Sequence, residues 1–132
     1  GALPYNVTPE HAAQARQILG PGKALCVEQK ICLTEDPGTA RDVAAAQLKM
    51  YLGLPNYRNC WLSLGFTEDE LSDRGSDRFL DAMVAWGSET TIRARLQAHF
   101  DAGADHVAIQ PFDPAGGSSP YWNALATFAP GS

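Results

Sequence analysis

The stretch SETTIRARLQAHFDAGADHVAIQPF, residues 88–112, decides the fold that the sequence predicts. Ser88 is a favourable N-cap, and three apolar residues follow it at helical spacing: Ile92, Leu96 and Phe100. Gly103 ends the predicted helix, and residues 105–112 form a strand. A helix followed so closely by a strand indicates an α/β layer, in which helices cover a parallel sheet. Gln110 would then lie at the carboxyl end of its strand, where parallel folds place their ligands.

Residues 23–33 form the longest predicted strand. One of its faces is apolar, with Leu25, Val27, Ile31 and Leu33, and the other carries Cys26, Glu28, Lys30 and Cys32. Glu28 and Lys30 must therefore either reach solvent at a sheet edge or point into a polar interior. Because long helical connections separate residues 23–33 from residues 105–112, we expect the two strands to be parallel neighbours.

Helix signals account for most of the remaining chain. A capping residue followed by proline begins helices at Thr8-Pro9 and Asp36-Pro37, and these end at Gly20 and Gly53. Shorter helices are predicted over residues 56–64, from Ser76 onward and over residues 121–128, with a loop at residues 113–120. The run Met83 to Trp86 fits either a helix end or a short strand, because four apolar residues do not establish a period.

Composition excludes several functional classes. The 132 residues are 45% hydrophobic and carry a net charge of −5, which suits one domain and argues against nucleic acid as the main partner. No apolar run reaches the length of a membrane helix and no signal peptide is recognisable, so we expect a cytoplasmic protein that does not enter membranes. The three cysteines lack metal-binding spacing and are expected to be core residues.

No catalytic signature is present, and the isolated candidates have structural explanations. Adjacent residues on a strand point to opposite faces, which argues against Asp105 and His106 as a catalytic pair. The acids between Glu68 and Asp73 follow Thr67 as a capping box would, so no metal site is predicted. His11 and His99 are expected to cap helices or line a surface.

Two segments offer groups for a ligand. Residues 56–61 combine two amides with two aromatic side chains after a helix break, which helix packing alone would not require. Gly87-Ser88 precedes a helix N-terminus, where free N–H groups could accept an anion, although capping alone also explains the pair.

A series of segments in chain order resembles the luciferase-like monooxygenase family, in particular its actinobacterial branch that uses the deazaflavin coenzyme F420. The segments are PEH at residues 9–11, VEQK at 27–30, YLGLPNYRN at 51–59, LGFTEDEL at 64–71, GSDR at 75–78, AWG at 85–87 and AGADHV at 102–107. The resemblance covers nearly the whole chain.

The resemblance implies that residues 1–132 are the C-terminal part of a (β/α)8 TIM barrel, about strands six to eight with their helices, with an insertion at about residues 54–75. The N-terminal strands, which form most of the coenzyme ring pocket and the phosphate site in such enzymes, would lie outside this chain. The sheet as given would be incomplete.

The function implied by the resemblance is that of an oxidoreductase or monooxygenase acting on a small organic substrate with F420 or FMN as coenzyme. It places seven residues at the pocket rim, for coenzyme or substrate binding: Tyr5, Asn56, Tyr57, Asn59, Trp86, Gly87 and Gln110. No catalytic proton donor is assigned. The alternative is a non-catalytic half-barrel that pairs its open sheet edges with another copy, so the expected partner is either a homo-oligomer or the missing N-terminal half.

Overall fold

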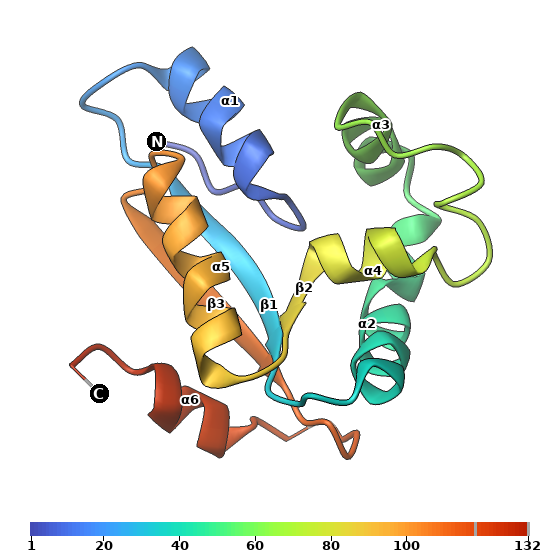
Figure 1. Ribbon diagram of the computed structural model, residues 1–132. Helices are drawn as coiled ribbons and strands as arrows, with labels where there is room; N and C mark the ends of the chain where they lie inside the picture. Colours follow the sequence, from blue (N-terminus) through green and yellow to red (C-terminus); the bar gives the residue numbers. More distant parts are fainter. Residues whose placement is uncertain (118, 132) are drawn as a thin grey trace.

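The computed structural model describes residues 1–117 and 119–131. These residues form six helices and a three-stranded parallel sheet (Figure 1). The predicted loop at residues 113–120 includes Ser118, which lies outside the described residues. In chain order the elements are α1 Pro9–Leu19, β1 Cys26–Cys32, α2 Pro37–Leu52, α3 Pro55–Ser63, α4 Asp77–Met83, β2 Val84–Trp86, α5 Glu89–Asp101, β3 His106–Phe112 and α6 Trp122–Phe128.

Local signals place these elements where the sequence predicts them. Thr8, Asp36, Ser76 and Ser88 cap α1, α2, α4 and α5, each accepting a hydrogen bond from a backbone N–H three residues on. The ambiguous run at residues 83–86 is mainly a strand, because Val84 to Trp86 pairs with the second half of β1. The expected reciprocal capping box is also present, since the Thr67 and Glu70 side chains each accept from the other's backbone N–H.

β1 is the central strand of the sheet. It pairs in parallel with β2 on one edge and over its whole length with β3 on the other, with Lys30 opposite Gln110. The predicted pairing of β1 with β3 is therefore confirmed.

The strand order differs from the order that a barrel implies. A (β/α)8 barrel sets successive strands side by side, which would place β2 between β1 and β3. In this sheet β1 lies between the other two. The described residues therefore form an open α/β layer. Their strands do not follow one another in chain order, as the strands of a (β/α)8 barrel do.

Helices cover both faces of the sheet (Figure 1). Val27 and Ile31 face α1, α5 and α6, where they pack with Ala12, Ile92 and Phe128. The opposite face meets α2, α3 and α4, and its largest core cluster contains Cys32, Leu48, Trp61, Phe79 and Leu80. Within the described residues, no helix combines the length and apolar character that crossing a bilayer requires.

Candidate functional site

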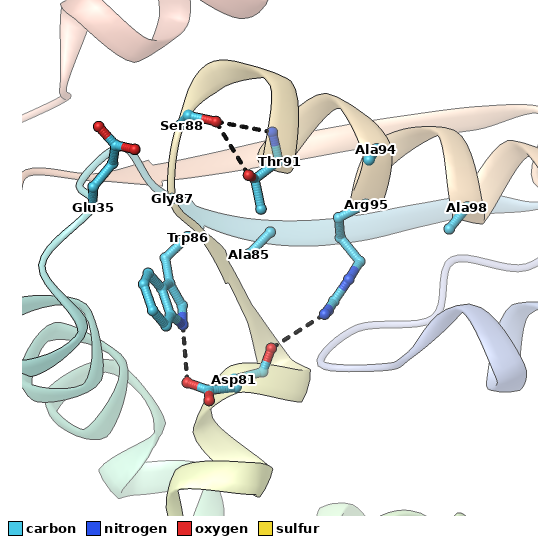
Figure 2. Close-up of a pocket in the computed structure, with 10 residues that line it drawn as sticks. All are labelled: Glu35, Asp81, Ala85, Trp86, Gly87, Ser88, Thr91, Ala94, Arg95 and Ala98. Atoms are coloured by element: carbon cyan, nitrogen blue, oxygen red, sulfur yellow. Dashed lines mark hydrogen bonds between the residues drawn. The ribbon is translucent and has the colours of Figure 1, made fainter.

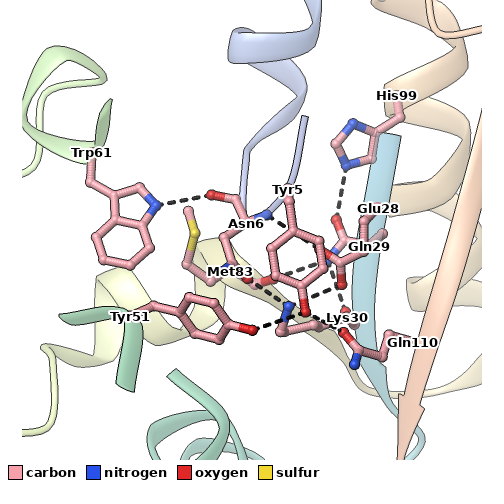
Figure 3. A network of polar contacts seen from close by, with 10 residues as sticks. All are labelled: Tyr5, Asn6, Glu28, Gln29, Lys30, Tyr51, Trp61, Met83, His99 and Gln110. Carbon is pink, nitrogen blue, oxygen red and sulfur yellow. Dashed lines mark hydrogen bonds and ion pairs between the residues drawn. The ribbon is translucent and has the colours of Figure 1, made fainter. Parts of the chain in front are cut away.

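The N-terminal segment positions the first site residues by running along β1. Cys26 N donates to Ala2 O at 3.0 Å, and Glu28 N donates to Pro4 O at 3.2 Å. These hydrogen bonds stop at Glu28, and from Lys30 onward β2 pairs with the same edge of β1. The next two residues of the segment, Tyr5 and Asn6, consequently turn over the polar face of the strand (Figure 3).

Lys30 is fully buried on that polar face, with 1% of its surface exposed. Its Nζ lies 2.6 Å from Asn6 Oδ1 and 3.1 Å from Glu28 Oε1, and 3.8 Å from the centre of the Tyr5 ring. Burial lowers the pKa of the Lys30 amine, while the Glu28 carboxylate acts in the opposite direction. Of the two positions open to Glu28 and Lys30 in the sequence, the polar interior is the one observed.

Asn6 joins this charged pair to the aromatic core. Its backbone has φ 57°, a left-handed conformation that Asn adopts more readily than most residues. Its N–H donates to Glu28 Oε2 at 3.3 Å, and its carbonyl accepts from Trp61 Nε1 at 2.9 Å. Its side-chain Nδ2 is buried and has no hydrogen-bond partner within the described residues. The turn at Asn6 is therefore fixed by contacts with two elements, β1 and α3, and one amide donor is left unused.

A chain of hydroxyl groups continues from this cluster. The Tyr5 hydroxyl donates to Gln110 Oε1 at 2.9 Å, and the Tyr51 hydroxyl donates to the Tyr5 hydroxyl at 3.3 Å (Figure 3). The hydrogen bond to Tyr5 and partial burial raise the pKa of Tyr51. The structure thus brings together Tyr5 and Gln110, two residues predicted for the pocket rim.

Tyr57 extends the aromatic series toward a shallow hollow. Its ring centre lies 5.0 Å from that of Tyr51 and 5.8 Å from that of Trp61. The hollow has a volume of about 280 Å³ and is lined by Tyr5, Asn56, Tyr57, His11, Cys60 and three apolar residues of the N-terminal segment. Three of the predicted rim residues therefore share one hollow. Asn59 is exposed and is absent from its lining.

Trp86 and Gly87 line a different cavity, of about 610 Å³, between α4, β2 and α5 (Figure 2). Trp86 Nε1 donates to Asp81 Oδ1 at 2.9 Å, and Arg41 holds the same carboxylate through two hydrogen bonds of 3.0 and 2.7 Å. These contacts lower the pKa of Asp81, chiefly through Arg41. Of the seven predicted residues, Tyr5, Asn56 and Tyr57 therefore line one hollow, and Trp86 and Gly87 line another that shares no residue with it. Gln110 and Asn59 line neither of them.

The environment of Ser88 favours helix capping over anion binding. Its Oγ accepts from Thr91 N at 3.3 Å, as an N-cap does. The adjacent cavity carries two acidic side chains, Glu35 and Asp81. The Arg95 guanidinium beside them donates to the carbonyls of Ala82 and Asp81. Capping therefore accounts for Ser88.

His99 is fully buried, so the surface position predicted for it from the sequence is wrong. Its Nε2 lies 2.9 Å from Gln29 Oε1 (Figure 3). The Gln29 amide nitrogen donates to the carbonyls of Lys30 and Met83, so its oxygen accepts and His99 carries its proton on Nε2. Burial is the main cause that lowers the pKa of His99 to about 4. One feature of the sequence could have predicted a buried histidine. Gln29 is the one amide among the apolar positions of β1, and a buried amide needs a polar partner.

Other candidate groups have structural roles. Asp105 accepts from Arg16 at 2.7 Å and from Leu25 N at 2.8 Å, which ties α1 and β1 to the start of β3. Cys32 lies in the core, and burial raises the pKa of its thiol to about 11, whereas Cys26 and Cys60 are only partly buried. The described residues include no group of three His, Cys, Asp or Glu side chains placed to hold a metal ion.

Comparison of the chain with protein-family models, with curated proteins and with solved structures found no match.

Proposed function

We propose that the chain is the C-terminal portion of a luciferase-like oxidoreductase or monooxygenase that uses F420 or FMN on a small organic substrate. Its contribution would be the rim formed by Tyr5, Asn56, Tyr57 and Gln110. The observation that carries this proposal is the hydrogen bond between Tyr5 and Gln110 above the buried Lys30. It sets two predicted rim residues side by side at the carboxyl half of the sheet, where parallel folds bind ligands.

The buried charges support a binding role over a purely structural one. The desolvation penalty of a buried ion pair is about as large as the attraction between its charges. Lys30 and Glu28 therefore add little net stability compared with apolar residues. What they do provide is a fixed positive charge directly behind the Tyr5 ring. A binding surface benefits from such a rigid polar support.

The donor set fits part of a flavin-like ring system. Such a ring presents a flat face and an edge of carbonyl and N–H groups, and the hollow offers tyrosine rings with the amide of Asn56. Its volume of about 280 Å³ suits a ring edge or a small substrate better than a whole coenzyme. When bound, the coenzyme would supply hydride transfer or, for reduced flavin, oxygen activation. Tyr5, Tyr57 and Asn56 would hold and orient the ligand.

The barrel itself is part of the proposal. It requires further strands supplied from outside residues 1–132, which would have to join the outer edges of β2 and β3. Within the described residues, β2 has one strand neighbour, β1, and its outer edge is paired with no other strand.

Coenzyme titration of the purified chain tests the function. F420 and FMN, each oxidised and reduced, are added while coenzyme fluorescence or absorbance is followed. We expect binding at micromolar concentration, weakened at least about tenfold by combined Asn56→Ala and Tyr57→Ala substitutions. Asn59→Ala is the matched control, because Asn59 lies on the same helix outside the hollow and should bind as the unmodified chain does. Absence of binding up to about 1 mM would contradict the proposal.

A second candidate function is the non-catalytic chain that assembles with its own copies. It is favoured by β3, whose one described strand neighbour is β1, so that its other edge is open along a groove. Sedimentation of the chain in the absence of coenzyme tests this candidate, and a monomer at high concentration would contradict it.

A further inference from the structure

The outer edge of β3 offers backbone groups to another strand. His106 N lies 3.4 Å from Leu25 O, so the N–H of His106 points toward β1. Backbone N–H groups alternate in direction along a strand, which turns those of Val107 and Ile109 outward. Pro111 is the next outward position and has no N–H, as is usual for a proline within an edge strand. The open edge therefore has two donors, and both lie in its first half.

A groove of about 740 Å³ runs along this half of β3. Its walls are α5 and the end of α6, and its larger apolar lining residues include Leu96, Phe100, Val107, Ile109, Leu125 and Phe128. Phe100 is 43% exposed, and it adjoins the other apolar residues of the groove instead of standing alone on the surface. The groove thus combines exposed apolar side chains with unpaired strand groups.

We propose that this edge binds the same edge of a second copy of the chain, forming a two-fold dimer in which β3 pairs antiparallel with β3 of its partner. A two-fold interface brings identical surfaces together, so each copy must supply both halves of every contact. The proposal deepens the second candidate function and is independent of coenzyme binding.

Backbone complementarity selects the register of this dimer. With the two-fold axis at Ala108, Val107 of each copy opposes Ile109 of the other, and both residues exchange two hydrogen bonds. With the axis at Ile109, Val107 would oppose Pro111, which cannot donate. Ala108 is exposed and small, so two such residues can meet at the axis.

Charge complementarity on α5 points to the same partner. The lining of the groove includes Arg93, Leu96, Gln97 and Phe100 of α5 together with residues 106–109 of β3. Arg93 and Asp101 lie four residues to either side of Gln97, about 6 Å along the helix axis in each direction. Antiparallel pairing of the two β3 strands makes the two α5 helices antiparallel as well, so the end of each helix that carries Asp101 lies toward the half of the other that carries Arg93.

The first test measures the association state by sedimentation equilibrium of the whole chain. We expect a dimer whose dissociation constant rises at least about tenfold in Ala108→Lys, because two like charges would face each other across the axis. Ala108→Ser is the matched control and should leave association unchanged. A monomeric chain, or a higher oligomer, would overturn the proposal.

The second test fixes the register by oxidation of one introduced cysteine per variant, in a Cys26→Ser, Cys60→Ser background whose remaining Cys32 is buried. This background is needed because Cys26 is the β1 neighbour of His106. Ala108→Cys should cross-link two chains rapidly, since directly opposed residues of this type lie about 4.5 Å apart, within the range of a disulfide. His106→Cys should not, because the two copies of position 106 would lie about 13 Å apart. Dimers that cross-link equally at both positions, or at neither, would refute this register while leaving the coenzyme titration unaffected.

Discussion

The Tyr5 hydroxyl donates a 2.9 Å hydrogen bond to Gln110 Oε1, across 105 positions of sequence. This contact joins the N-terminal segment to the last strand, on the face of the sheet that also buries Lys30. Tyr51 donates to the same hydroxyl, so one oxygen atom connects three elements. The role of the Tyr5 hydroxyl can be separated from that of the Tyr5 ring by substitution.

Tyr5→Phe removes that hydroxyl and keeps the ring over Lys30. The loss of two partly buried hydrogen bonds should lower the free energy of unfolding by about 1–2 kcal/mol, measured by urea denaturation. Tyr57→Phe serves as control, since the Tyr57 hydroxyl makes no hydrogen bond within the described residues. Equal losses in both variants would argue against a role for the hydroxyl chain.

Lys30→Met should destabilise the fold by about 3–5 kcal/mol, because it leaves the Glu28 carboxylate buried without its counter-charge. The double variant Glu28→Gln, Lys30→Met removes both charges and should recover most of that loss. Denaturant unfolding of the two single variants and the double variant measures the coupling. If the losses simply add, the two residues do not act as a buried pair.

Asn6→Ala should be less stable than Asn6→Gly by about 1 kcal/mol. Both substitutions remove the side chain that accepts from Lys30, but only glycine adopts φ 57° without strain. The difference between the two melting temperatures therefore isolates the backbone contribution. A more stable alanine variant would mean that the turn relaxes to a negative φ.

His99 should make the protein less stable as pH falls from about 6.5 to 4. Because the pKa of His99 is lowered to about 4 from 6.5, the unfolded chain binds more protons in this window, and unfolding becomes easier by about 3 kcal/mol in total. This stability is fully present above pH 6.5 and is lost as pH decreases toward the folded pKa.

His99→Gln keeps an N–H donor for Gln29 and does not titrate, so it is the matched control. Its free energy of unfolding should vary less with pH between 7 and 4 than that of the unmodified chain. Identical pH profiles would show that His99 is not the group responsible.

Several features of the fold were predictable because their causes are local. Thr8, Asp36, Ser76 and Ser88 each satisfy backbone groups within three residues, and such caps can be recognised in the sequence alone. The apolar alternation of β1 likewise marks a strand whichever strands become its neighbours.

The site was only partly predictable, because its residues are brought together by the fold. Tyr5, Asn56 and Tyr57 were predicted and share a hollow, whereas Trp86 and Gly87 lie in another cavity. The network around Lys30 was missed, since nothing in its neighbouring residues indicates that Asn6 turns back over it.

The sequence by itself determined where the helices and strands lie, the parallel pairing of β1 with β3 and the polar face of β1. It left open the order of the strands and the burial of His99. Only the tertiary structure decided that β1 lies in the centre, that His99 meets Gln29 and that Tyr5 reaches Gln110. The physical reason is that caps and periodicity act within a few residues, whereas strand order and buried polar contacts depend on groups far apart in the chain.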